Sequence, residues 1–320
     1  MVAPLIEFKN VSKKFDGKTV ISDLNLGIMP GELFVLVGSS GSGKTTTLKM
    51  INRLLEKSSG TITVAGRGIE DYSLTDLRWQ IGYVLQQIAL FPTMTVAKNV
   101  SVVPDMQRVS GRKVRGLVDN LLAEVGLDAS FRNRMPIELS GGQQQRVGII
   151  RALAGKPPII LMDEPFSALD PLARESLQKL ILKLHTKYQN TIVFVTHDMD
   201  EALKLGDRIG IMKNGKLLQV DTPKEITNNP ANKFVADFFS NNRYSDLNKV
   251  LVNQIIEAGF MAPRQIDEKV RAAPSVEQLS NLKEVLRLLA SSPLVKIIDA
   301  RGKPIGCFDN ESIIRFLSTI

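Results

Sequence analysis

The sequence predicts an α/β fold in which helices cover a parallel sheet. Continuous apolar runs bounded by glycine, such as residues 33–37, are typical of buried parallel strands. Elsewhere, residues 114–125 and residues 177–188 carry apolar side chains at helical spacing. Strands that alternate with amphipathic helices indicate a parallel sheet with helices on its faces.

The predicted elements follow in this order along the chain. Residues 5–35 favour strands, and residues 24–28 alternate between apolar and polar side chains, as a half-buried strand does. Residues 45–54 predict a helix that residues 58–60 would end. Residues 91–153 are mostly helical in pattern and predict a helical subdomain. Further strands are predicted at residues 61–65, 159–162 and 191–196.

The length and composition allow about two domains. The chain has 320 residues, of which 43% are hydrophobic, as in an ordinary globular protein. We expect the first domain to cover residues 1–240 and the second to cover residues 247–320, with a polar linker at residues 239–246. The net charge of +8 is compatible with a solvated surface, with anionic lipid or with nucleic acid, and does not decide between them.

The sequence gives no sign of export or of a membrane span. The longest apolar stretches are a few residues each, whereas a spanning helix needs roughly 20. The first residues lack the charged start and apolar core of a signal peptide. The single cysteine, Cys307, excludes an internal disulfide and fits a reducing compartment. We therefore expect a cytosolic protein.

A phosphate-binding loop follows the predicted strand at residues 33–37. Residues 38–45 fit the pattern GxxxxGK[ST], in which backbone amides and the start of the next helix bind phosphate oxygens. Lys44 would reach the β- and γ-phosphates of a nucleoside triphosphate, and the Thr45 hydroxyl would hold Mg²⁺. The residues assigned to the nucleotide here are Gly38, Ser39, Ser40, Gly41, Ser42, Gly43, Lys44, Thr45 and Thr46.

Two acids end the apolar run at residues 159–162. Asp163 would hold Mg²⁺, and Glu164 is the candidate general base for an attacking water. The alternative is a pair of acids that starts a helix. The phosphate loop upstream favours the catalytic interpretation.

The string Leu-Ser-Gly-Gly-Gln at residues 139–143 lies between these two halves of a nucleotide site. With it, the chain resembles the ATP-binding subunit of an ATP-binding-cassette (ABC) transporter over residues 5 to about 240. The resemblance implies an ABC-type ATPase fold with a parallel core sheet, an antiparallel β subdomain and a helical subdomain. It also implies ATP and Mg²⁺ as cofactors.

The resemblance assigns further residues to the site. Gln86 would reach the metal and the attacking water, with Gln87 as the alternative, and His197 would sense the γ-phosphate. Phe15 would stack on adenine unless it belongs to the core. Asp170 would lie near the nucleotide. His185 has no motif and is interpreted as a surface residue.

In such ATPases the Leu-Ser-Gly-Gly-Gln string acts on the ATP of a second copy. The two glycines open a helix, and we expect no role for the string inside its own chain. The resemblance therefore implies a homodimer with two ATP molecules between the chains. The residues assigned to the partner's nucleotide are Ser140, Gly141, Gly142 and Gln143.

The resemblance also implies partners at the membrane. Residues 89–96 would grip a coupling helix of an integral membrane permease, the alternative being ordinary loop packing. The ATPase would be peripheral, at the cytoplasmic face of the membrane, and would serve a substrate-binding protein indirectly. No nucleic acid is expected.

Residues 50–54 and 163–171 resemble the osmoprotectant branch, which imports glycine betaine, carnitine, choline or proline. The alternatives are an importer of another solute, such as an amino acid, methionine or a phosphonate, or a soluble ABC protein that acts on ribosomes or nucleic acid.

The C-terminal residues resemble a single cystathionine-β-synthase (CBS)-type module, an α+β domain. Residues 295–298 and 305–308 predict a hairpin, and a helical face is predicted from Leu279 to Leu289. Such modules normally occur in pairs, whereas residues 247–320 have room for only one copy. We expect regulation by ionic strength or by a nucleotide, the alternative being a structural dimerisation tail.

Overall fold

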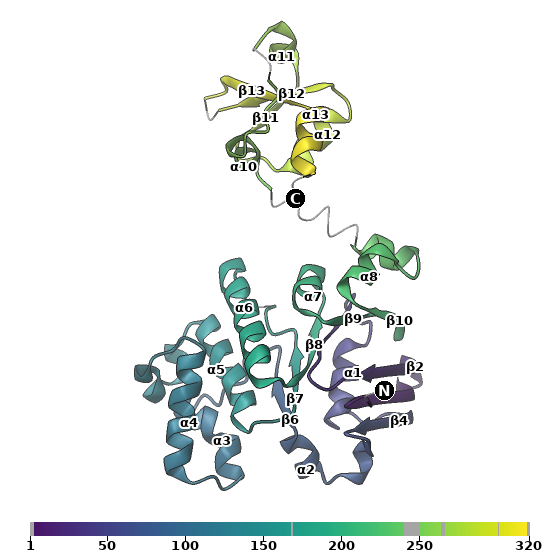
Figure 1. Ribbon diagram of the computed structural model, residues 1–320, viewed down its shortest axis with the longest axis vertical. Helices are drawn as coiled ribbons and strands as arrows, with labels where there is room; N and C mark the ends of the chain where they lie inside the picture. Colours follow the sequence, from purple (N-terminus) through teal and green to yellow (C-terminus); the bar gives the residue numbers. More distant parts are fainter. Residues whose placement is uncertain (1–2, 168, 240–249, 264–265, 300, 319–320) are drawn as a thin grey trace. The chain divides into compact units, whose positions relative to one another are not determined.

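The computed structural model describes residues 3–167, 169–239, 250–263, 266–299 and 301–318. The chain divides into two compact units, Met1–Val235 and Ala236–Ile320 (Figure 1). Apart from Phe239, the linker predicted at residues 239–246 lies outside the described residues.

A six-stranded sheet forms the centre of the first unit, and it confirms the predicted α/β fold. The strand order is β10-β9-β3-β8-β7-β6, and only the β9–β10 pair is antiparallel within this sheet. Every residue of β3, β7 and β8 is buried, as their apolar runs predict. The strands are β3 (Leu33–Gly38), β6 (Ile81–Val84), β7 (Ile159–Asp163), β8 (Thr191–Thr196), β9 (Arg208–Lys213) and β10 (Lys216–Asp221).

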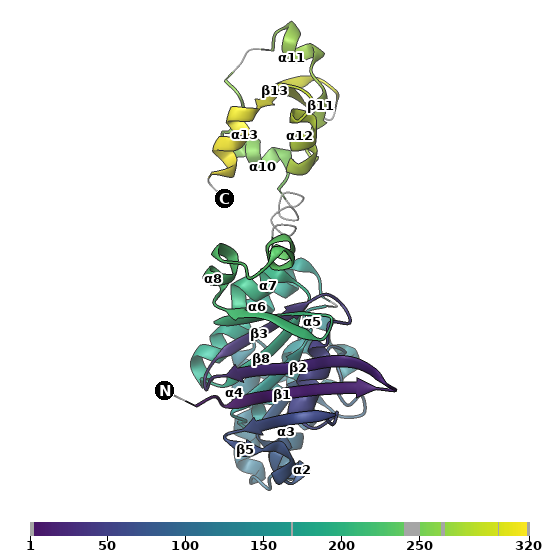
Figure 2. The ribbon, with the colours of Figure 1, turned by 90° about the vertical axis from the view of Figure 1, so that its right-hand side faces the viewer.

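A second, antiparallel sheet has the order β2-β1-β4-β5 (Figure 2). The alternating segment at residues 24–28 lies in β2, with its apolar side chains buried as predicted. The strands are β1 (Ile6–Phe15), β2 (Lys18–Ile28), β4 (Ser59–Val64) and β5 (Arg67–Gly68).

The helix after the phosphate loop is shorter than predicted. α1 covers Lys44–Ile51, and Ser59 and Gly60 begin β4 instead of ending the helix. A side chain at Gly60 would come within 2.3 Å of the Asn10 backbone oxygen. The glycine therefore allows β4 to approach β1 closely.

Helices cover the central sheet and build the helical region. The predicted apolar face of α4 is buried, and the helix ends before Gly126, whose φ of 70° is left-handed. The helices are α2 (Leu74–Trp79), α3 (Val96–Met106), α4 (Gly111–Glu124), α5 (Gly141–Ala154), α6 (Pro171–Tyr188), α7 (Met199–Leu205) and α8 (Pro223–Asn228). Short 3₁₀ helices are Ile69–Asp71, Ala129–Asn133 and Pro136–Glu138. No helix among the described residues has the length and apolar character that crossing a membrane requires.

His185 is not the plain surface residue that the sequence suggested. Its ring is half-buried on α6, and Nε2 lies 3.0 Å from the carbonyl oxygen of Gly31. The histidine therefore fastens α6 to the turn that precedes β3.

The second unit is a three-stranded sheet with the order β11-β12-β13 and its own apolar core. The predicted hairpin is confirmed, and the buried Cys307 lies on β13. Leu279 does not belong to the predicted helical face: it precedes α12 in a turn and is 74% exposed. The strands are β11 (Ser275–Glu277), β12 (Leu294–Ile298) and β13 (Pro304–Asp309). The helices are α10 (Val252–Glu257), α11 (Glu268–Ala272), α12 (Leu282–Leu289) and α13 (Asn310–Leu317).

Candidate active site

The phosphate loop connects the carboxyl end of β3 to α1. Gly38 must be glycine, because a Cβ there would lie 2.2 Å from the carbonyl oxygen of Met212. Gly43 has a φ of 107°, a left-handed conformation that other residues rarely adopt. Ser39, Ser40 and Gly41 are exposed at the tip of the loop.

The first turn of α1 is open to an anion. Its N-cap, Gly43, has no side chain to accept the free amides, and the first turn carries no acid. The Ser42 hydroxyl is buried without a hydrogen-bond partner. Thr46 is half-buried within this helix. Unpaired donors of this kind suit phosphate oxygens.

Lys44 folds back over the loop. Its Nζ donates to the carbonyl oxygens of Gly38 at 2.8 Å and Ser39 at 3.0 Å. Burial lowers the pKa of Lys44, while the nearby charges of Glu164 and Asp163 oppose that shift. The ammonium group is therefore held at the loop, where a phosphate would give it a stronger partner than two carbonyls.

Asp163, the last residue of β7, meets Thr45 of α1. The Thr45 hydroxyl donates to Oδ1 of Asp163 at 2.8 Å, and the Tyr83 hydroxyl donates to Oδ2 at 3.4 Å. Burial raises the pKa of Asp163, and the Thr45 hydrogen bond and the charge of Lys49 oppose that shift. A buried carboxylate beside a hydroxyl is a donor set that fits Mg²⁺. Sequence reasoning missed Tyr83, whose strand lies beside β7.

Glu164 and His197 come together at the ends of two neighbouring strands. Nδ1 of His197 lies 3.0 Å from Oε2 of Glu164, and the Glu164 amide donates to the carbonyl oxygen of Val195 at 2.9 Å. Glu164 has a φ of 43°, which is unusual for a residue other than glycine. The helix-start alternative is wrong, because Glu164 lies in a turn and α6 begins only at Pro171.

Gln86 and Phe15, which the resemblance assigns to the site, are exposed at or just after the ends of β6 and β1. Gln86 and Gln87 are both exposed just after β6, and no hydrogen bond among the described residues joins either to Asp163 or Glu164. Phe15 ends β1 and is 39% exposed, with Nζ of Lys13 4.5 Å above its ring. The alternative that Phe15 belongs to the core is therefore wrong.

The Leu-Ser-Gly-Gly-Gln string starts α5, as predicted, but it also has a role within its own chain. The Ser140 hydroxyl accepts from the amide of Gln143 at 3.3 Å, and Oε1 of Gln143 accepts from the Ser140 amide at 2.9 Å. This capping box stabilises the helix start, so the expectation of no such role is wrong. Ser140 and Gly141 remain exposed. A cleft of about 340 Å³ adjoins Ser140, Gly142 and Gln143.

Asp170 caps α6 in a similar way. Its Oδ1 accepts from the amide of Ala173 at 2.9 Å, and Ala173 lines the same cleft.

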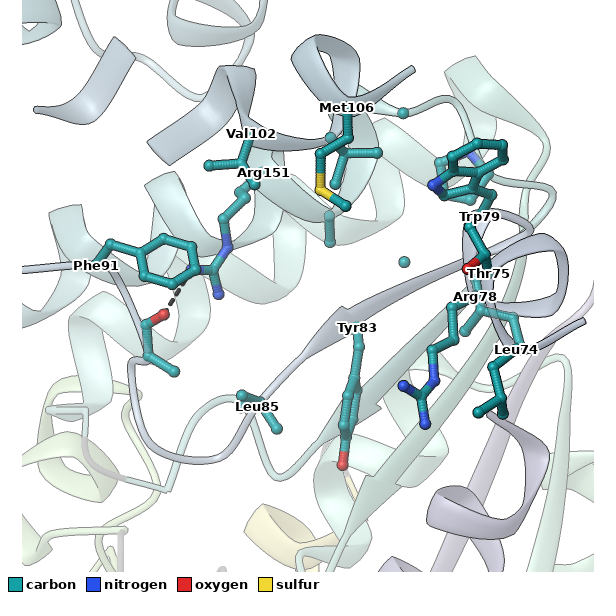
Figure 3. A pocket seen from close by; sticks show the side chains of 17 residues that line it. Leu74, Thr75, Arg78, Trp79, Tyr83, Leu85, Phe91, Val102, Met106 and Arg151 are labelled. Carbon is teal, nitrogen blue, oxygen red and sulfur yellow. Dashed lines mark hydrogen bonds between the residues drawn. The ribbon is translucent and has the colours of Figure 1, made fainter. Parts of the chain in front are cut away.

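A larger, mostly apolar groove lies between β6 and the helical region. Figure 3 shows Phe91 with Arg151 on one side of the groove and Trp79 on the other. Nη1 of Arg151 donates to the carbonyl oxygen of Ala89 at 2.5 Å, and burial lowers the pKa of this guanidinium. The volume is about 600 Å³. The large apolar side chains exposed in the groove are Leu74, Trp79, Phe91 and Met106.

The fold and the site together define a phosphate-loop nucleotide-binding protein. The sequence family described as "ABC transporter" matches residues 21–167. The chain belongs to the ABC transporter family.

Curated relatives extend this similarity. The chain is 50% identical over 240 residues to the glycine betaine/carnitine/choline transport ATP-binding protein OpuCA of Bacillus subtilis, a match that covers 75% of this chain and 63% of OpuCA. It thus matches less than two thirds of the length of that relative. It is 40% identical over 312 residues to the glycine betaine uptake system ATP-binding protein YehX of Escherichia coli, covering 97% of this chain and 99% of YehX.

Solved structures share the cassette fold. The ATP-binding cassette MJ0796, a dimer bound to ADP and phosphate, is 37% identical with a TM-score of 0.62, and the match covers 68% of this chain and 98% of that chain. The cbiO1 protein of Clostridium perfringens, part of an ABC transporter complex, is 28% identical with a TM-score of 0.67, and covers 78% of this chain and 100% of its own.

Proposed function

We propose that this chain is the ATP-hydrolysing subunit of an import system for quaternary amine osmoprotectants of the glycine betaine, carnitine and choline type. The observation that carries the hydrolytic part is the Glu164–His197 pair beside the Thr45–Asp163 pair. The solute class is supported by relatives named for transport of glycine betaine, carnitine and choline.

In the proposed reaction, ATP binds with its phosphates on residues 38–46. The open amides of α1 and the Ser42 hydroxyl donate to phosphate oxygens, and Lys44 exchanges its two carbonyl partners for the β- and γ-phosphates. Phe15 offers an exposed ring for adenine. Mg²⁺, held by Thr45 and Asp163 with Gln86 as a further ligand, would neutralise phosphate charge when bound.

Glu164 is the proposed general base. Its carboxylate takes a proton from the water that attacks the γ-phosphate. The His197 contact orients this carboxylate, and the imidazole is the proposed sensor of the γ-phosphate. Both side chains keep solvent access, with 18% of Glu164 and 57% of His197 exposed.

The proposed enzyme is a homodimer. Ser140, Gly141, Gly142 and Gln143 form a helix start, exposed at Ser140 and Gly141, that would meet the γ-phosphate held by a second copy, with Asp170 close by. A dimeric cassette bound to ADP and phosphate, 37% identical to this chain, supports this arrangement. Closure on ATP and release after hydrolysis would then drive transport.

The groove beside Phe91 is the proposed docking site for an integral membrane permease. It combines exposed Trp79, Phe91 and Met106 with two arginines, Arg78 and Arg151, a surface that suits an amphipathic helix. The chain would then lie at the cytoplasmic face of the membrane, and a substrate-binding protein would act through the permease.

The second unit is proposed to be a single CBS-like regulatory domain over residues 247–320. Its hairpin and flanking helices support this assignment. We expect it to make transport respond to ionic strength or to a nucleotide.

The test is uptake by the assembled transporter. The chain and its permease are expressed in a bacterial strain without betaine uptake, and entry of labelled glycine betaine is measured with competing solutes. Uptake that carnitine or choline inhibits, and that Glu164→Gln abolishes, is the expected result. Transport of an amino acid or a phosphonate instead of betaine would overturn the assigned solute class.

A further inference from the structure

Arg174 is a residue of α6, and its side chain lies between α6 and α7. α6 follows Glu164 in the chain, α7 follows His197, and the two helices pack together. Nη1 of Arg174 donates to Oδ2 of Asp198 at 3.4 Å, and its Nε lies 3.8 Å from Oε1 of Glu201. The guanidinium on α6 therefore faces two carboxylates at the start of α7.

Those two carboxylates fix the backbone on both sides of His197. The Thr196 hydroxyl donates to Oε2 of Glu201 at 2.6 Å, and the Asp198 amide donates to the Thr196 hydroxyl at 3.0 Å. Oδ1 of Asp198 accepts from the amides of Asp200 and Glu201 and so caps α7. Both neighbours of His197 thus belong to the network that Arg174 contacts.

The backbone of Arg174 belongs to the first turn of α6, the helix that follows the turn at Glu164. Its amide donates to the carbonyl oxygen of Asp170 at 2.9 Å, in the first turn of α6. The amide and hydroxyl of Ser167 donate to the carbonyl oxygen of Glu164 at 3.3 and 3.1 Å. A cavity of about 40 Å³ separates the two loops, and its lining includes Glu164, Ser167, Arg174, Thr196, His197 and Glu201.

We propose that Arg174 is a positioning residue that holds His197 against Glu164 by fixing the start of α7 to α6. It acts through His197 and not on the nucleotide, and the proposal rests on the ATPase function given above. A small displacement of a group that orients the base slows the chemical step more than it weakens substrate binding. A lysine would replace the guanidinium poorly, because one ammonium group cannot face two carboxylates in the same fixed geometry.

The experiment measures ATP turnover and the KM for ATP in the assembled transporter. Arg174→Gln should lower kcat about 10-fold and leave KM within about two-fold of the unmodified protein. The kcat of Arg174→Lys should lie between that of Arg174→Gln and that of the unmodified protein. The control is Lys179→Gln, which removes a cation from the exposed face of the same helix, where Lys179 pairs with Glu175. We expect the control to match the unmodified protein.

A double-variant cycle separates positioning from general destabilisation. In a His197→Ala background, adding Arg174→Gln should cause no further loss of residual turnover, because the histidine through which Arg174 acts is already absent. A further 10-fold loss, an unchanged kcat in Arg174→Gln, or a raised KM alone would overturn the proposal. If Arg174→Gln does not fold, as judged by thermal melting, Arg174→Lys takes its place in the cycle. An unmodified transporter without ATP turnover would refute the proposed function itself.

Discussion

Nδ1 of His197 and Oε2 of Glu164 are 3.0 Å apart, although 33 positions separate the two residues in the chain. The register of the central sheet causes this proximity. β7 and β8 run parallel with Asp163 opposite Val195, so the residues just beyond their carboxyl ends meet at one edge of the sheet. That edge is where ligands bind in open α/β sheets.

Removing the proposed base should separate binding from turnover. Glu164→Gln keeps the size of the side chain but cannot accept the proton of the attacking water. Phosphate release should fall by about 10²- to 10⁴-fold. ATP binding, measured by calorimetry, should persist. Undiminished phosphate release would remove Glu164 from this role.

Ser140→Ala should lose turnover beyond its effect on stability. The lost helix cap costs about 1 kcal/mol of folding free energy. The matched control is Thr222→Ala, because the Thr222 hydroxyl caps α8 at the same 3.3 Å distance, away from the site. Both variants should have a lower melting temperature than the unmodified protein. Only Ser140→Ala should also lose ATP turnover, by about 10-fold or more. Equal turnover in the two variants would reduce Ser140 to a cap.

Trp79 should anchor the permease. Trp79→Ala should leave ATP binding by the isolated subunit intact, and should weaken co-purification with the permease by at least about 10-fold. Ile314→Ala serves as the control, because Ile314 is 64% exposed on the second unit and outside the groove. Full permease binding by Trp79→Ala would argue against docking at this groove.

Glu32 should make the stability of the folded chain depend on pH. Burial raises the pKa of Glu32 above its usual 4.5, and the charge of Asp207 adds to that shift, while the Met29 amide and Arg208 oppose it. The native state therefore holds this proton more tightly than the unfolded chain does. The resulting stabilisation is lost as pH rises through the raised pKa.

Glu32→Gln lacks this titration. In thermal melts of nucleotide-free protein from about pH 4.5 upward, the unmodified protein should lose stability relative to Glu32→Gln as pH rises. Glu56→Gln controls for the loss of one carboxylate at an exposed position. Parallel melting profiles for the unmodified protein and Glu32→Gln would contradict the expectation.

Deletion of residues 245–320 should remove the osmotic control of uptake and leave ATP hydrolysis intact. The first unit has its own core and contains each proposed site residue, so ATP turnover should continue. Betaine uptake by the truncated transporter should no longer respond to osmolarity. If uptake still responds as in the full-length protein, the second unit is not the sensor.

Features that depend only on residues close together in the sequence could be predicted from it. The phosphate loop and the strands around it need only a local pattern, and the structure has them as expected. The contact of Tyr83 with Asp163 was not predictable, because it depends on which strands are neighbours in the sheet. The same holds for Gly60, where a side chain would collide with the backbone of β1. It also holds for His185, whose hydrogen-bond partner Gly31 is 154 positions away in the chain.

The buried position of Cys307 has a practical consequence for spectroscopy. The thiol is the sole cysteine of the sequence and is 1% exposed, so maleimide dyes should reach it slowly in the folded chain. One cysteine introduced at an exposed position can therefore carry a fluorophore or spin label selectively. Labelling of the unmodified protein should therefore be close to that of a cysteine-free protein. In the proposed homodimer, one label on each chain would report changes in the distance between the two copies during the ATP cycle.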